Sequence, residues 1–113
     1  MRTSKPAKLL RLHFGEGDRY HGKPLYEAIV NRCKDLKIGG ATVFRGLEGY
    51  GETAEIHRHH LTRSDQPIVV NIVDTAENLE RLIPEIEVMM DTGLVAISDV
   101  EYMRIEKVPV ADV

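Results

Sequence analysis

"QPIVVNIVD", from Gln66 to Asp74, is the most apolar stretch of this 113-residue chain, and it decides the fold. A short run rich in β-branched residues predicts a strand. Its apolar character indicates a central place in a sheet. Pro67 lacks the N–H that a strand ladder needs, so it fits only the first position of that strand.

A second predicted helix follows this strand directly. Asp74 and Glu77 resemble a capping box, with Asp in place of the usual Ser or Thr. Pro84 lies inside the helical pattern and is expected to kink it, because proline cannot donate the backbone hydrogen bond. Gly93 is expected to end the helix, and "LVAISDVEYMRIEKV", starting at Leu94, predicts a last strand. The apolar stripe consists of Leu79, Leu82, Ile83, Ile86, Met89 and Met90.

A strand and a first helix are predicted at the start of the chain. "AKLLRLHF", from Ala7 to Phe14, alternates apolar and polar residues as a half-buried strand does. Pro24 suits the first turn of a helix. Either Gly39 or Gly40 is expected to end this helix in the left-handed conformation. The helix stripe consists of Leu25, Ala28, Ile29, Cys33 and Leu36.

The remaining strand candidate is "ATVFRGLEGYG", residues 41–51, in which Gly46 indicates a bulge or a close approach of another backbone or ligand. A polar connection, residues 51–65, then leads to the central strand, and loops of that length are usually functional or disordered. The order βαββαβ predicts one domain over the whole chain, an α+β ferredoxin-like plait with both helices on one face of a four-stranded antiparallel sheet. Residues 1–6 are expected to be a flexible N-terminus, and residues 108–113 a C-terminal tail.

The face of the sheet away from the helices needs a cover. Self-association is the usual solution in so small a domain, and a trimer with three sheets facing inward is one arrangement that provides it. Arg11 and His13 alternate with the core face of the first strand, so they would face either the centre of a trimer or solvent.

Composition excludes several classes of protein. The net charge is −3 and the chain has no Trp and only two Phe, which argues against a nucleic-acid binder. Cys33 is the only cysteine, so an intramolecular disulfide is impossible and a cytoplasmic protein is expected. The N-terminal residues lack a signal-peptide pattern, and no apolar run is long enough to insert into a membrane.

Three histidines cluster in "GETAEIHRHH", residues 51–60. His57 and His59 would share one face of a strand, whereas His57 and His60 would share one face of a helix. Imidazole suits zinc, copper or nickel, but a tight site needs further ligands and groups that orient them. The alternatives are a solvated loop and a loop that contacts a ligand or partner. Catalysis is not expected, since a Ser–His–acid set here would lie on a single loop without a rigid scaffold.

Several segments together resemble the PII signalling proteins and, more closely, their uncharacterised PII-like relatives. "LKIGGATV", starting at Leu36, is similar to the glycine-rich entry to the second strand of PII, and "GYG", at 49–51, is similar to the base of the PII T-loop. "LRLHFGEGDRYHGKPLYEAIV", "TVFRGLEGYG" and "GLVAISDV" are nearer the PII-like branch. The likeness extends from Ala7 to about Lys107.

The resemblance implies a homotrimer that binds adenine nucleotides in clefts between subunits and moves its T-loop to engage transporters or enzymes. Carried over by position, Gly49 and Gly51 would lie near the nucleotide phosphates, Thr42 would line the cleft, and Arg104 would match a basic residue of the last strand. Arg45 is a further candidate ligand-binding residue.

The chain also departs from the PII pattern. "FRGLE" supplies five residues where PII has four, and Gly46 could absorb the extra one as a bulge. "MDTGLVAI" lacks the lysine of the PII phosphate loop, and Glu106 stands where PII has its second basic residue. A triphosphate needs several positive or N–H donors, so AMP or a cyclic nucleotide is expected to fit better than ATP.

These observations predict a non-enzymatic, PII-like trimeric regulator. A small-molecule effector, expected to be an adenine nucleotide, would bind at the subunit clefts without any required cofactor. The T-loop-like arm, residues 51–65, would contact a protein partner such as a membrane transporter or ion channel through His57, Arg58, His59, His60 and Arg63. The alternative is a metal-binding module that uses His57, His59 and His60, as in divalent-ion tolerance proteins of the same fold. A third hypothesis is a structural interaction protein without a small ligand.

Overall fold

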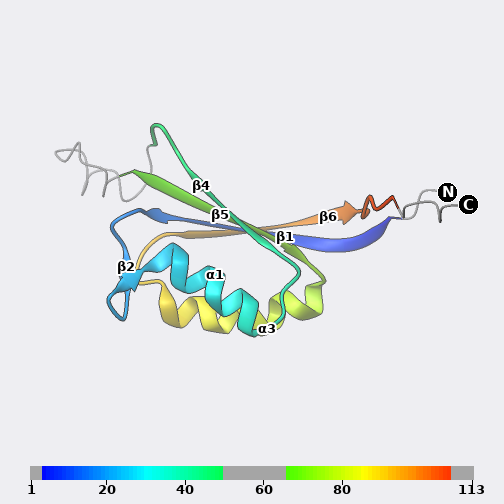
Figure 1. Cartoon of the computed structure of the whole chain (residues 1–113), viewed down its shortest axis with the longest axis horizontal. Coiled ribbons are helices and arrows are strands. Elements are labelled where there is room, and N and C mark those ends of the chain that lie inside the picture. Colours follow the sequence, from blue (N-terminus) through cyan, green and yellow to red (C-terminus); the bar gives the residue numbers. More distant parts are fainter. Residues whose placement is uncertain (1–3, 50–65, 108–113) are drawn as a thin grey trace, which may run out of the picture.

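The computed structural model describes residues 4–49 and 66–107. Within these ranges, four strands form one antiparallel sheet in the order β4-β5-β1-β6, and both helices cover the same face of it (Figure 1). The predicted α+β plait is therefore confirmed, and the apolar stretch that decides the fold occupies a central strand. The strands of the sheet are β1 (Lys5–Gly15), β4 (Ala41–Arg45), β5 (Pro67–Asp74) and β6 (Leu94–Tyr102), and the helices are α1 (Leu25–Asp35) and α3 (Ala76–Met89).

One apolar core lies between the sheet and the helices. The predicted alternation in β1 is confirmed, since Leu10, Leu12 and Phe14 are buried. Helix α3 presents its stripe to the same core, as the burial of Leu82 and Ile86 shows. Burying side chains of this size contributes roughly 1.5–3 kcal/mol each, and this core supplies most of the stabilising free energy of the fold. Neither α1 nor α3, the helices of the described part, has the length and apolar character needed to span a bilayer.

A small hairpin, not predicted from the sequence, precedes α1. It joins β2 (Arg19–Tyr20) to β3 (Lys23–Pro24). The turn residues His21 and Gly22 have φ angles of 51° and 81°, and positive φ at both central positions is the geometry that suits a two-residue hairpin loop. Pro24 closes the hairpin and serves as the N-cap of α1, one position before the first turn where it was predicted.

Helix α1 ends differently from the prediction. The left-handed residue is Lys37, with φ of 59°, and neither Gly39 nor Gly40 has a positive φ. The Ile38 amide donates to the Cys33 carbonyl at 2.9 Å, and the Lys37 amide donates to the Lys34 carbonyl at 3.1 Å. These two bonds form a Schellman motif, in which the buried Ile38 side chain supplies the usual apolar contact.

Helix α3 begins one residue later than the capping-box prediction placed it. Thr75 is the N-cap, and its hydroxyl accepts a hydrogen bond from the Asn78 amide at 3.1 Å. Pro84 lies inside the helix without ending it. The helix ends at Met89, and Gly93, with φ of 137°, belongs to the turn that enters β6.

The strand ends also correct three predictions. Strand β1 begins at Lys5, so the last two residues of the predicted flexible N-terminus belong to the sheet. Strand β4 ends at Arg45, so Gly46 is not a bulge within it. Strand β6 ends at Tyr102, so the predicted last strand is shorter than its sequence pattern suggested.

Candidate functional site

Arg45 and Glu16 form an ion pair at one end of the sheet. Arg45 is the last residue of β4, and its Nε donates to Glu16 Oε1 at 2.8 Å while a second guanidinium nitrogen donates to Glu16 Oε2. The hydrogen bond to Glu16 and the negative charge of its carboxylate raise the pKa of Arg45. The predicted ligand-binding arginine is thus engaged by an acidic side chain that the sequence analysis did not single out.

Close backbone contacts surround this pair. The Glu16 amide donates to the Gln66 carbonyl at 2.9 Å, and the Gly46 amide donates to the Pro67 carbonyl at 2.7 Å. A Cβ at Gly46 would lie 2.7 Å from Pro67 Cγ, and one at Gly49 would lie 3.1 Å from it. The close approach predicted at Gly46 is confirmed, since a side chain there would collide with Pro67, whereas one at Gly49 would need Pro67 to move by a few tenths of an ångström.

Thr42 and Phe44 lie on the face of the sheet away from the helices. Thr42 pairs with Asn71 of β5, and Phe44 pairs with Val69. Both β4 side chains are exposed, Phe44 by 50%. Thr42 is therefore accessible to a ligand, although it faces the side of the sheet opposite to the apolar core.

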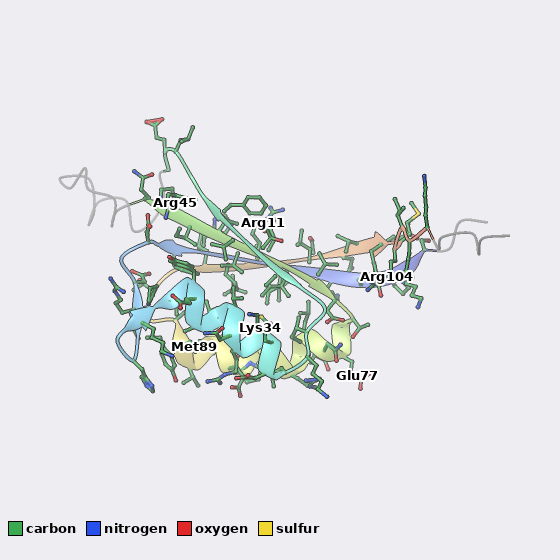
Figure 2. The ribbon with its side chains drawn as sticks, viewed as in Figure 1. Arg11, Lys34, Arg45, Glu77, Met89 and Arg104 are labelled. Atoms are coloured by element: carbon green, nitrogen blue, oxygen red, sulfur yellow. The ribbon has the colours of Figure 1, made fainter. Side chains whose placement is uncertain are left out.

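Arg104 lies at the other end of the molecule from Arg45 (Figure 2). It is exposed and comes two residues after the end of β6 at Tyr102. Tyr102 pairs with Lys5, whereas Arg45 lies near the opposite end of β1, beside Glu16. Phe14 marks the level of Arg45 in the sheet, because both residues pair with Ile68 of β5. Phe14 lies nine residues after Lys5 in β1, a span of about 30 Å at the rise of a β-strand. The predicted ligand-binding residues Arg45 and Arg104 cannot contact one small ligand from the same subunit.

The uncovered face of the sheet carries apolar and polar side chains together. Arg11 projects from this face, on the side away from the helices (Figure 2), and its Nε donates to Asn71 Oδ1 at 3.3 Å. His13 shares this face by its register with Val69 and Leu94. The large exposed apolar residues on this face and at the β6 edge are Phe44, Val73, Leu94, Val95 and Ile97.

Gly51 and the predicted partner-contact residues His57, Arg58, His59, His60 and Arg63 lie outside the described residues. Neither the partner-contact hypothesis nor the alternative histidine metal site is tested by the structure. Among residues 4–49 and 66–107, no group of three or more His, Cys, Asp or Glu side chains could hold a metal ion. Cys33 lies in the core as predicted, and burial raises the pKa of its thiol to about 11.

A family model described as an uncharacterized ACR, DUF190, matches residues 7–102. A UPF0166 protein of Aquifex aeolicus is 43% identical over 98 residues, which cover 85% of this chain and 92% of that protein. A UPF0166 protein of Methanocaldococcus jannaschii is 36% identical over 96 residues, which cover 82% of this chain and 88% of that protein.

Solved structures of PII-like proteins share the fold. The CPII protein of Thiomonas intermedia K12, bound to ADP, AMP and acetate, has a TM-score of 0.61 at 19% identity, covering 90% of this chain and 93% of CPII. A putative PII-like signaling protein of Thermus thermophilus also scores 0.61, at 17% identity, covering 88% of this chain and 90% of that one. The divalent ion tolerance protein CutA1 of Ehrlichia chaffeensis scores 0.52 at 12% identity, covering 94% of this chain and 87% of that one.

Proposed function

Because this chain belongs to the DUF190 family and has the PII-like fold, we propose that it is a non-enzymatic regulator that binds an adenine nucleotide between the subunits of a trimer. The observation that carries the proposal is the separation of its candidate cationic residues. Arg45 and Arg104 occupy opposite ends of one sheet (Figure 2), so a ligand that uses both needs two subunits. A cyclic trimer joins different surfaces of neighbouring subunits, because its interfaces are heterologous, and such an interface can bring Arg45 of one subunit beside Arg104 of the next.

The uncovered sheet face supports the trimer. Phe44 at 50% and Leu94 at 53% are too exposed to contribute much to the folding of one subunit. Burying such side chains against neighbouring subunits contributes about 25 cal/mol for each Å² of apolar area. Arg11 Nε already donates to Asn71 Oδ1 within the subunit, so burying this face in a trimer would not leave that donor without an acceptor.

The charge of the site favours a nucleotide with few phosphates. Of the candidate cations that the structure describes, Arg45 is already paired with Glu16, and Arg104 must come from a neighbouring subunit. Two guanidinium groups, one of them shared with a carboxylate, suit a monophosphate or a cyclic phosphate better than a triphosphate. AMP and cyclic AMP are therefore the first ligands to test, and CPII provides a PII-like precedent because it was solved with AMP and ADP.

The proposed output is a contact of the 51–65 arm with a protein partner such as a transporter or ion channel. The bond from Gly46 to Pro67 joins the segment before the arm to the segment after it, and the bond from Glu16 to Gln66 ties the segment after it to the end of β1. A ligand that binds beside these contacts changes the arm only if its affinity differs between two arm conformations. The ratio of the two affinities would therefore set how strongly the nucleotide changes the binding of the arm to its partner.

Two measurements test the proposal. Light scattering should give the mass of a trimer, and a monomer at all concentrations would refute it. A thermal-shift panel of AMP, cyclic AMP, ADP and ATP should show stabilisation that follows mass action, about 2.7 kcal/mol at a hundredfold excess over Kd. Arg104→Ala and Gly49→Val should each reduce the shift, while Lys34→Ala on the exposed face of α1 serves as the matched control. Equal shifts in the wild type and these three variants would refute the assignment of Arg104 and Gly49 to the ligand site.

The same panel separates the alternative function. Zinc, copper and nickel are included because CutA1 shares the fold and because three histidines lie close together in the sequence. If only metals raise the melting temperature, and a His57/His59/His60→Ala variant loses that effect, the metal-binding module replaces the nucleotide regulator. If neither metals nor nucleotides act on a confirmed trimer, the structural interaction protein is the remaining hypothesis.

A further inference from the structure

The Glu16–Arg45 pair has an inner and an outer partner. The Glu16 side chain is 12% exposed, whereas the Arg45 side chain is 46% exposed. The Glu16 backbone is also fixed, since its amide donates to the Gln66 carbonyl where the chain enters β5. The carboxylate is therefore held in place by the fold, and the guanidinium reaches it from the outer side.

A carboxylate in this position resembles the ligand expected at the site. The planar fork of arginine binds carboxylates and phosphates with the same two-bond geometry. Glu16 fills that fork through both oxygens, as the phosphate of a nucleotide would. A phosphate that approaches Arg45 must either replace the carboxylate or bind beside it, and like charges at such distances repel.

We propose that Glu16 is an internal counterion that competes with ligand phosphate for Arg45, and that it thereby sets how much negative charge the site accepts. This inference rests on the proposed function, because it concerns the same site. It makes Glu16 a specificity-determining residue, although the residue itself would not bind the ligand. The repulsion grows with each phosphate, so Glu16 should weaken the binding of ADP more than the binding of AMP.

A purely structural ion pair is the competing explanation. Exposed ion pairs contribute little to stability, and such a pair would leave ligand binding unaffected. Glu16→Gln distinguishes the two explanations, because it removes the negative charge and keeps nearly the same shape. Glu48→Gln is the matched control, since it removes the same charge from an exposed residue near the same end of β4 and Glu48 is not the ion-pair partner of Arg45.

Calorimetric titrations with AMP, ADP and pyrophosphate are run on the full-length wild type, Glu16→Gln, Glu48→Gln and the double variant Glu16→Gln/Arg45→Gln. Removing Glu16 should tighten AMP binding about threefold, the size expected for the loss of one partly exposed ion pair. ADP binding should tighten by a larger factor. The double variant should not show this increase in affinity for either nucleotide, because it lacks the guanidinium group of Arg45. Glu48→Gln removes a nearby charge that does not contact Arg45, so it should change each affinity much less than Glu16→Gln does.

The outcomes separate this inference from the proposed function. If nucleotides bind the wild type and Glu16→Gln behaves like Glu48→Gln, the inference is refuted and the function stands. A second outcome is that none of the four proteins binds AMP or ADP, but Glu16→Gln binds pyrophosphate more tightly than Glu48→Gln and the double variant does not. In that case the inference stands and the proposed function fails. If Glu16→Gln does not fold, NMR of the Arg45 Nε–H in the wild type replaces it. Added pyrophosphate should shift that resonance, and an unmoved resonance refutes the inference.

Discussion

Asp74 joins the start of β4 to the start of α3, and replacing it by asparagine tests how much this link stabilises the fold. One carboxylate oxygen accepts from the Gly39 amide at 2.8 Å. The other accepts from the Thr75 amide at 2.7 Å and from Asn78 Nδ2 at 3.0 Å. An asparagine keeps one acceptor oxygen and presents an NH₂ group in place of the other, so at least one of these donors loses its partner.

The expected destabilisation follows from these bonds. A hydrogen bond to a charged group contributes about 1.5–3 kcal/mol, and the partial exposure of Asp74 lets water replace some of it. Asp74→Asn should therefore lower the free energy of unfolding by about 1 kcal/mol. For a domain of this size that corresponds to roughly 4 °C in melting temperature. Asp91→Asn, in the exposed turn after α3, should change stability by less than about 0.5 kcal/mol and is the control.

The effect should depend on pH in a defined direction. Partial burial alone raises the pKa of Asp74, but the hydrogen bonds from Gly39, Asn78 and Thr75 outweigh it and hold the pKa below its ordinary value of 3.8. A carboxyl group with a lowered folded-state pKa adds stability above its unfolded-state pKa and loses it as pH falls through the folded value. The difference between wild type and Asp74→Asn should therefore be full at pH 7 and shrink below roughly pH 4.

Urea unfolding measures this difference, and the protein concentration is kept fixed because the proposed trimer would make stability depend on it. The midpoint should fall with an unchanged slope, which shows that stability and not compactness has changed. Equal midpoints for Asp74→Asn and Asp91→Asn at pH 7 would refute the reasoning. A difference that persists undiminished at pH 3 would refute the assigned role of the charge.

Three further changes test other parts of the fold. Gly93→Ala should destabilise by about 2 kcal/mol or more, because φ is 137° and the new Cβ would lie 2.4 Å from the His13 carbonyl oxygen; Gly40→Ala, with no atom within 4 Å of its Cβ, is the control in the same urea assay. Lys37→Gly should stabilise by about 0.5–1 kcal/mol in thermal melts, since glycine adopts the left-handed conformation without strain, and a lower melting temperature would contradict this. The Cys33 thiol, with its pKa raised to about 11 by burial, should react with iodoacetamide at pH 8 only in urea-unfolded protein, so rapid labelling of folded protein would contradict the assignment.

The order of the elements could be predicted because burial imposes a period on the sequence. Leu10 and Leu12 alternate in β1, and Leu79, Leu82 and Ile86 recur at helical spacing in α3, so each pattern identifies both the element and its buried face. These residues all pack into the one core between the sheet and the helices, and a different arrangement would expose them. The fold therefore follows from features that extend over many positions of the chain.

The ends of the elements could not be predicted in the same way. Asp74 and Thr75 are both good N-cap residues, and the structure uses Thr75 as the cap because Asp74 holds the Gly39 amide of another segment. Lys37 takes the left-handed position although two glycines follow closely, because that register buries Ile38 in the core. Contacts between distant segments decided both cases, and a local pattern contains no information about them.

The same limit applies to the candidate site. Arg45 and Glu16 are far apart in the sequence and meet only because of how the strands of the sheet are arranged, so no local motif marks Glu16. Likewise, the resemblance to PII suggested Arg104 for the ligand and Arg45 was a further candidate, but strand pairing places the two at opposite ends of a subunit. If both contact the same nucleotide, binding and assembly are coupled, because the complete site exists only where two subunits meet. A nucleotide that uses both residues must then stabilise the assembled form, and its apparent affinity must fall as dilution separates the subunits.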